Sequence, residues 1–140
     1  MIKIDSSDLN KFSVMLRELP DEIKDNVRKV VKNSAFNIER NAKSSASVKT
    51  GHLRRSISTK MGDMEATIHT SNLKYAPMVE FGTRPHIIRA KNKKALYWKG
   101  ATHPVKQVNH PGSKAKPYLI PAFDKEVPYF VEKLKEVVEW

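Results

Sequence analysis

The residue types best suited to chemistry gather near the centre of the 140-residue chain. Four of them lie within one stretch: Glu80, Arg84, His86 and Tyr97. A carboxylate or imidazole beside a cation is what a small basic ribonuclease uses for acid–base work at a phosphate. The alternative is structural, because Glu80 has an apolar neighbour on each side and can pair with an arginine such as Arg54 or Arg84. We favour the structural interpretation and expect no catalytic residue here.

Metal and cofactor chemistry is not indicated either. The chain has no cysteine. It also has no Gly-rich phosphate loop, no Gly-x-Ser-x-Gly and no His-Glu-x-x-His. His86, His103 and His110 lie in a segment without carboxylates, where a divalent cation would be repelled and would lack supporting acceptors. We therefore expect no metal, no cofactor and no enzymatic activity.

Positive charge is concentrated in two segments. The chain has 26 Lys and Arg against 15 Asp and Glu, a net charge of +11. Residues 40–60 contain six basic residues and no acid, and residues 84–116 contain nine and no acid. Such a field indicates a polyanion or an acidic protein as partner, or simply a solubilising surface. The second segment supplies the candidate contacts to DNA or to a partner: Arg84, Arg89, Lys91, Lys93, Lys94, Lys99, Lys106, Lys114 and Lys116.

The N-terminal third predicts helix. Ser7 is a candidate N-cap for a first helix, with apolar residues at Leu9, Phe12, Leu16 and Leu19. Pro20 suits the start of a second, long helix over 20–44. Apolar and small residues then recur at helical spacing: Ile23, Val27, Val30, Ser34, Ile38 and Ala42.

The middle of the chain predicts strands. Residues 56–60 and 65–70 alternate around the turn "MGDM", which indicates a hairpin. "HIIRAK" (86–91) and "KALYWK" (94–99) form a second candidate pair, joined by Asn92 and Lys93. A long basic loop follows, with a short strand over 105–108. Tyr97 and Trp98 among lysines would suit base stacking, although an amphipathic strand with Leu96 and Trp98 on its core face explains them as well.

The C-terminus returns to helix, with Pro121 in its first turn and a kink or restart at Pro128. The fold class is therefore α+β: a small antiparallel sheet packed by a long N-terminal helix and a C-terminal helix. We expect one domain over 1–140, with a helical part (1–46), a sheet with a long basic loop (47–116) and a final helix (117–140). No apolar run reaches the ~18 residues of a membrane span, so we expect no membrane contact.

Three segments together resemble a known family. They are "VKTGHLRRSI" (48–57), "YAPMVEFGT" (75–83) and "HPGSKAKPYLIPAF" (110–123). Their order and spacing resemble the tail-completion, or head–tail joining, proteins of long-tailed bacteriophages and prophages. In the third segment Tyr118 stands where the family pattern has Phe. The resemblance covers about 48–123.

The resemblance implies a structural virion protein of the neck, without catalysis, and the α+β fold already expected. It implies a place at the head–tail junction and in the bacterial cytoplasm during assembly. The partners would be other neck and tail proteins, with the chain as a cyclic homo-oligomer, six-fold by analogy, or a monomer in isolation. A basic module that binds nucleic acid non-specifically, and a small ribonuclease toxin, remain as alternatives.

The matching motif residues would have structural roles. Tyr75 and Phe81 are candidate anchors of the core or of an interface, and Gly82 would adopt a turn conformation that other residues resist. Glu80 would need a cationic partner, with Arg54 as the first candidate, or backbone donors. The full set is Thr50, Gly51, Leu53, Arg54, Tyr75, Glu80, Phe81, Gly82, Thr83, Pro117 and Pro121.

Overall fold

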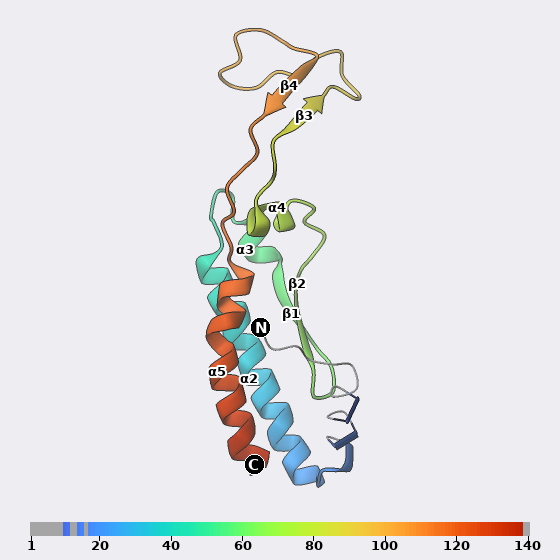
Figure 1. Ribbon diagram of the computed structural model, residues 1–140, viewed down its shortest axis with the longest axis vertical. Coiled ribbons are helices and arrows are strands. Elements are labelled where there is room, and N and C mark those ends of the chain that lie inside the picture. The colour runs from blue at the N-terminus through green and yellow to red at the C-terminus, as the bar shows by residue number, and fades with distance from the viewer. Residues whose placement is uncertain (1–9, 12–13, 16, 139–140) are drawn as a thin grey trace.

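The computed structural model describes residues 10–11, 14–15 and 17–138. Two long helices lie antiparallel and side by side, a β-hairpin runs along them, and a second two-stranded ribbon projects from one end (Figure 1). The elements are α2 (Asp21–Ser45), α3 (His52–Ser56), β1 (Ile57–Met61), β2 (Ala66–Thr70), α4 (Ala76–Phe81), β3 (His86–Arg89), β4 (Gln107–His110) and α5 (Leu119–Val138). The α+β prediction is confirmed.

Helix α2 follows its sequence pattern. Pro20 occupies the N-cap position and two acids, Asp21 and Glu22, fill the first turn, where they complement the helix dipole. The inward stripe is confirmed, because Val27, Ser34, Ala35, Ile38 and Ala42 are the buried residues of this helix. The helix predicted over 20–44 is thus confirmed to within a residue at each end. The predicted cap at Ser7 and the apolar positions 9, 12 and 16 lie outside the described residues.

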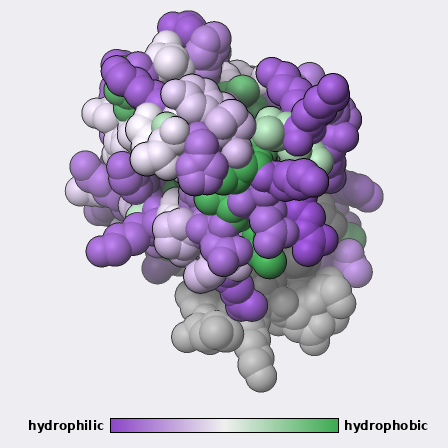
Figure 2. All heavy atoms as spheres, turned by 90° about the horizontal axis from the view of Figure 1, so that it is seen from above, coloured by the Kyte–Doolittle hydropathy of each residue, from purple (hydrophilic) through white to green (hydrophobic). Residues whose placement is uncertain are grey.

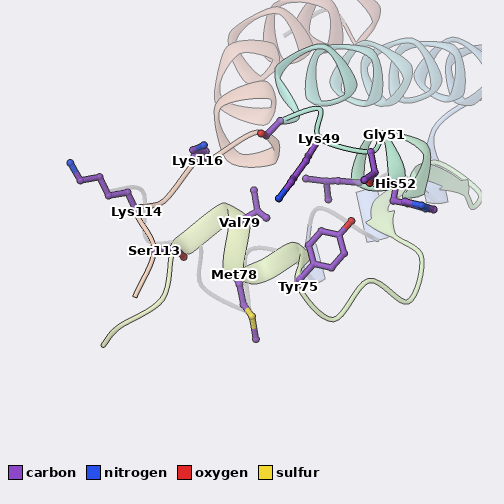
Figure 3. A pocket seen from close by; sticks show the side chains of 12 residues that line it. Lys49, Gly51, His52, Tyr75, Met78, Val79, Ser113, Lys114 and Lys116 are labelled. Atoms are coloured by element: carbon purple, nitrogen blue, oxygen red, sulfur yellow. The ribbon is translucent and has the colours of Figure 1, made fainter. Parts of the chain in front are cut away.

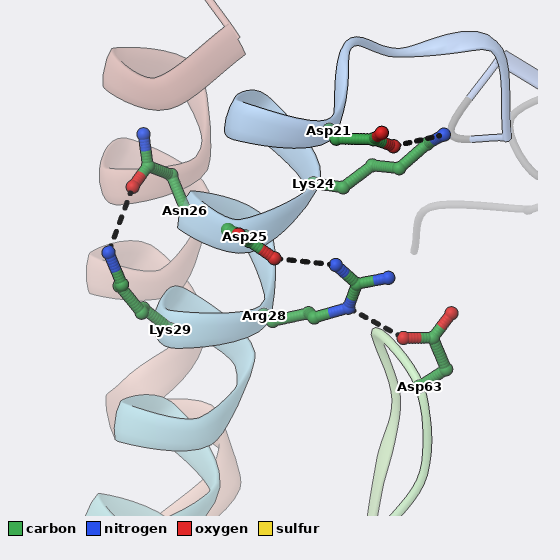
Figure 4. Close-up of polar contacts among 7 residues, drawn as sticks. All are labelled: Asp21, Lys24, Asp25, Asn26, Arg28, Lys29 and Asp63. Atoms are coloured by element: carbon green, nitrogen blue, oxygen red, sulfur yellow. Dashed lines mark hydrogen bonds and ion pairs between the residues drawn. The ribbon is translucent and has the colours of Figure 1, made fainter.

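The hairpin predicted in the middle of the chain is also confirmed. Strands β1 and β2 pair antiparallel from Ile57↔Thr70 to Met61↔Ala66. The turn is fastened to α2 by Arg28, which donates to Asp63 at 2.6 Å and to Asp25 at 2.7 Å (Figure 4). The free end of the hairpin is therefore tied to the start of α2.

The core is small and lies where α2, α3 and the start of α5 meet. Its buried residues are Ile38, Ala42, Ala46, Leu53, Ile57, Ala76, Tyr118 and Ala122. Four of them are alanines, so the elements approach closely here. The core thus sits at the end of the body from which the second ribbon leaves (Figure 1).

That second ribbon, which we call the arm (residues 84–116), corrects one prediction. Strand β3 pairs with β4, from His86↔His110 to Arg89↔Gln107, and not with residues 94–99. Leu96 forms only an isolated bridge with Val105. The observed pairing leaves Pro104 and Pro111 outside β4, so neither proline removes a hydrogen bond from the ribbon. The basic segment is thus a ribbon with a long tip rather than a strand pair followed by a loop.

Helix α5 runs from Leu119 to Val138 as one element, so the predicted restart at Pro128 is wrong. Pro128 cannot donate to the carbonyl four residues earlier. That carbonyl belongs to Asp124, and both residues are exposed, so water can replace the missing donor. Pro121 lies in the first turn, as predicted. None of the described helices combines the length and the apolar character that crossing a membrane requires.

Candidate interaction surface at the root of the arm

Glu80, on α4, holds the N-terminal end of α5 through three hydrogen bonds. The N–H groups of Tyr118 and Leu119 donate to its Oε2 at 2.8 and 3.0 Å. The N–H of Ile120 donates to Oε1 at 2.8 Å. The first N–H groups of a helix have no partner within it, and a negative charge there complements the helix dipole. Glu80, only 5% exposed, therefore caps α5 from a distant part of the chain.

The sequence around the start of α5 explains why a distant cap is needed. Tyr118 stands just before the helix, where Ser, Thr, Asp or Asn would normally accept these bonds, and its side chain cannot. Pro121 lacks an N–H, so the first turn has one donor fewer to satisfy. Burial, together with the charge of Glu80, raises the pKa of the Tyr118 hydroxyl. The missing local cap is the sequence signal that could have identified the partners of Glu80.

The first predicted partner of Glu80, Arg54, is wrong, whereas the alternative, that backbone donors satisfy the carboxylate, is confirmed. Arg54 is exposed on α3, and no ion pair of Arg54 occurs within the described residues. The backbone groups offer three fixed donors, so no arginine has to be buried to satisfy the carboxylate. The same geometry argues against Glu80 as a general base, because both its oxygens are occupied and shielded from solvent.

Two glycines shape the root of the arm. Gly82 has φ +73° and Gly112 has φ +85°, the left-handed region that side chains resist, so the prediction for Gly82 is confirmed. A Cβ on Gly82 would lie 2.6 Å from the carbonyl oxygen of Ser113. Beside the glycines, Thr83 and Ser113 exchange two backbone hydrogen bonds of 3.0 and 3.1 Å. Their hydroxyls add a third at 3.0 Å, so the two ends of the arm are joined where it leaves the body.

A pocket of about 330 Å³ lies between α3, α4 and the chain that returns from the arm (Figure 3). Residues from all three sequence motifs line it: Thr50, Gly51, Leu53, Tyr75, Lys114 and Lys116. Lys49, which sequence reasoning missed, extends toward Val79 across the pocket in Figure 3. No acidic residue lines it. The structure thus gathers residues separated by more than sixty positions into one cationic hollow with apolar walls.

Beside this pocket, α4 presents an apolar face. Tyr75, Met78 and Phe81 are spaced three apart and are 41%, 53% and 69% exposed. Tyr75 and Phe81 are therefore not core anchors, and that alternative is wrong. The core aromatic is Tyr118, which is 2% exposed. Grouped apolar side chains in contact with solvent are typical of protein contact sites, so the interface alternative for both residues remains.

The remaining motif residues divide in the same way. Leu53 lies in the core, whereas Arg54, Pro117 and Pro121 are exposed. The structure therefore brings together the pocket and the α4 face, and it leaves Arg54 outside both. Met78, another residue that sequence reasoning missed, belongs to both.

The cations of the arm have no acidic partner. All nine of its lysines and arginines are exposed, and the described part of the chain contains no ion pair to any of them. Seen from the arm end, hydrophilic side chains surround a small group of hydrophobic ones (Figure 2). Within the described residues, no cluster of three His, Asp or Glu side chains is placed to hold a metal ion. This surface can therefore bind a partner through electrostatic and apolar contacts.

Comparison with known proteins identifies the family of the chain. No curated protein and no solved structure matches the chain. A family model described as "Bacteriophage HK97-gp10, putative tail-component" matches residues 10–82, just over half of the chain. The match includes α2, the hairpin and α4, and it ends directly before the arm. The chain belongs to the HK97-gp10-like family of bacteriophage tail components, which is not a class of enzyme.

Proposed function

We propose that this tail component acts in the phage neck, where it completes the tail or joins the tail to the DNA-filled head. The observation that carries the proposal is the convergence of three separate sequence motifs on the pocket and the α4 face. Residues of these motifs form a surface fastened by Glu80 and by the Thr83–Ser113 pair, as an assembly interface requires.

The surface has the properties of a protein interface. Its centre is apolar, with two aromatics and a methionine among the exposed residues, and its rim is polar and cationic. Helix α4 lies at the end of the body from which the arm leaves (Figure 1), and its apolar side chains are exposed, so a neighbouring subunit can reach them without moving α2 or α5. Contact of this face with a different surface on the next copy would be heterologous, and such contacts close into rings when the rotation allows.

We propose a cyclic homo-oligomer in the virion, with six copies by analogy with the six-fold tail, and a monomer in isolation. The apolar face is small, and a stable interface needs roughly 1,200–2,000 Å² of buried surface. Other neck and tail proteins would therefore have to contribute to the ring. Native mass spectrometry of the purified chain and of isolated necks measures the number of copies that associate in each case.

Particles made without this protein test the joining role. Electron microscopy should show full heads and complete tails that are separate from one another. Normal virions in its absence would contradict the proposal.

A matched pair of variants tests the surface itself. Phe81→Ser removes the most exposed residue of the α4 face, whereas Tyr129→Ser removes an aromatic of similar exposure, 61%, from α5. Neither residue is buried, so both variants should fold. We expect only Phe81→Ser to give separated heads and tails. Equal assembly by both variants would move the contact away from α4.

A further inference from the structure

No other described part of the chain covers the arm. None of its residues is buried, although it forms a ribbon of two four-residue strands. An isolated two-stranded ribbon is marginally stable in water. Among the described elements, none covers a face of this ribbon or pairs with its outer edges (Figure 1). A binding partner would therefore have to cover the arm.

The charge of the arm limits what that partner is. Its nine cations account for most of the net charge of +11, and it contains no acid. Seven of the nine are lysines. Lysine is depleted at the centres of protein–protein interfaces, whereas it is a common ligand of phosphate as a point charge. A segment that carries only positive charges, most of them on lysines, thus favours a phosphate polyanion over an acidic protein as the binding partner.

The register of the ribbon shows which face would meet such a partner. Side chains alternate along a strand, so Ile87, Arg89, Gln107 and Asn109 share one face. That face carries a guanidinium and two amides, the groups that bond to base edges and phosphates in DNA grooves. On the opposite face the ring centroids of His86 and His110 lie 5.1 Å apart, and the other pair there, Ile88 and Val108, is apolar, so that face offers fewer polar groups to DNA.

We propose that the arm binds double-stranded DNA, with the polar face of the ribbon in the major groove and the lysines of the tip on the phosphates. A groove about 12 Å wide admits a two-stranded β-ribbon. The fixed root at Gly82 and Gly112 holds the ribbon away from the body, so the body does not block the approach of a duplex. Most of the affinity comes from contacts of the lysines with phosphates, so the binding is largely independent of sequence, and it does not depend on whether the protein joins heads to tails.

Fluorescence anisotropy of the purified full chain with a labelled mixed-sequence duplex tests this inference. Dissociation constants on the order of 10⁻⁴ to 10⁻⁶ M are expected at physiological salt. Affinity should fall as salt is added, with a log–log slope of about −0.9 for each phosphate contact. No binding even at low salt would overturn the proposal and would favour an acidic protein as partner.

Two variants that lose the same number of positive charges distinguish the contribution of the arm to DNA affinity from that of net charge. The first changes four tip lysines to Gln: Lys91, Lys93, Lys94 and Lys99. The second changes four exposed body lysines to Gln: Lys32, Lys60, Lys125 and Lys135. We expect the tip variant to lose on the order of tenfold or more in affinity and to have a shallower salt slope. Equal losses in both variants would overturn the proposal, and thermal melting checks that both are folded.

Two neighbouring substitutions test the face. Ile87→Glu places a negative charge on the polar face, and Ile88→Glu places the same charge on the opposite face. Both residues are exposed, at 52% and 36%. Ile87→Glu should weaken duplex binding by the larger factor. Equal effects would overturn the placement of the polar face in the groove.

A single DNA strand of the same length tests whether the arm binds unpaired bases instead of the groove of a duplex. Exposed Tyr97 and Trp98 at the tip could stack on unpaired bases, which would favour single strands. We expect the duplex to bind at least as tightly as the single strand. A tenfold preference for the single strand would overturn the groove geometry.

Discussion

The body and the arm differ in the burial of their apolar residues and in the pairing of their charges. In the described part of the body, five ion pairs connect cations to nearby acids, and ten hydrophobic residues are buried. In the arm no residue is buried, and none of its cations pairs with an acid of the described residues. The family match includes much of the body and ends before the arm. The body is thus stabilised by contacts within the chain, whereas the arm carries the groups that a partner has to satisfy.

Limited digestion with trypsin should show the largest difference between the two. Cleavage within the arm requires only local opening, whereas cleavage in α2 requires loss of packing against the core. We expect cuts after Arg89 to Lys114 to appear first, faster than cuts in α2 by about a hundredfold or more, since body opening costs several kcal/mol. Arg84 and Lys116 precede proline and should resist. Mass spectrometry of timed samples identifies the sites, and early cleavage in α2 would contradict the comparison.

Replacement of Glu80 should lower the stability of the folded body more than any other single substitution proposed for it. Glu80→Ala leaves up to three N–H groups without a partner at the start of α5, each costing about 1–3 kcal/mol where it is shielded from water. The free energy of unfolding should therefore fall by roughly 3 kcal/mol or more. Glu80→Gln should lose less, because its carbonyl oxygen still accepts. Chemical denaturation measures both.

Arg54 provides the matched control for Glu80. Arg54→Gln should change the free energy of unfolding by less than about 0.5 kcal/mol, because its side chain is exposed and unpaired in the described structure. The double variant should equal the sum of the singles. A strong non-additive term between Glu80 and Arg54 would restore the ion pair that the structure contradicts.

The junction between body and arm should respond to smaller changes. Gly82→Ala forces a Cβ into the carbonyl of Ser113 at a positive φ, with an expected loss of about 1–3 kcal/mol. Gly100→Ala is the control, since its φ is also positive, +102°, but nothing lies within 4 Å of the added carbon. Melting should show the larger loss for Gly82→Ala. Equal losses would mean that backbone conformation, and not close contact at the root, sets the cost.

Most of the body could be predicted from the sequence because its elements follow local periodicity. The stripe from Ile23 to Ala42 and the alternation at 56–60 and 65–70 each indicate one element, and both predictions are confirmed. The arm could not be predicted in detail. The pairing of β3 with β4 joins segments about twenty residues apart, and no strong turn sequence marks it. Local pattern favoured the nearer partner, "KALYWK", which was wrong.

The candidate site shows the same limit. Sequence reasoning identified Glu80, Gly82 and the motif that contains Tyr118, but it ranked Arg54 above backbone donors as the partner of Glu80. Charge suggested Arg54, whereas a helix without a cap residue of its own needed an acceptor. Counting unsatisfied donors at the start of 119–138 would have indicated the right partner. The exposure of Tyr75 and Phe81 could not be read from hydrophobicity, which is equally high in cores and interfaces.

The smallest expected effect is the pH dependence that Glu39 gives to the body. Glu39, on α2, accepts hydrogen bonds from Lys43 and from the hydroxyl of Thr59 on β1, both at 2.5 Å. The bond from Lys43, and then that from Thr59, lower the pKa of Glu39. A carboxylate with a lowered pKa stabilises the folded state above its unfolded pKa of about 4.3. That contribution is lost as the pH falls through the lower folded pKa.

Glu39→Gln should therefore remove a stabilisation that the wild type has at neutral pH and loses in acid. The difference between the two proteins should be at most about 1 kcal/mol at pH 7 and should vanish at strongly acidic pH. Asp63 also has a lowered pKa, because Arg28 donates to it, so the wild-type curve alone mixes two groups. Asp63→Asn is the control that isolates the hairpin turn. Urea denaturation at several pH values measures both differences. A Glu39 difference that stays constant into acid would show that the stabilisation by Glu39 does not depend on its charge.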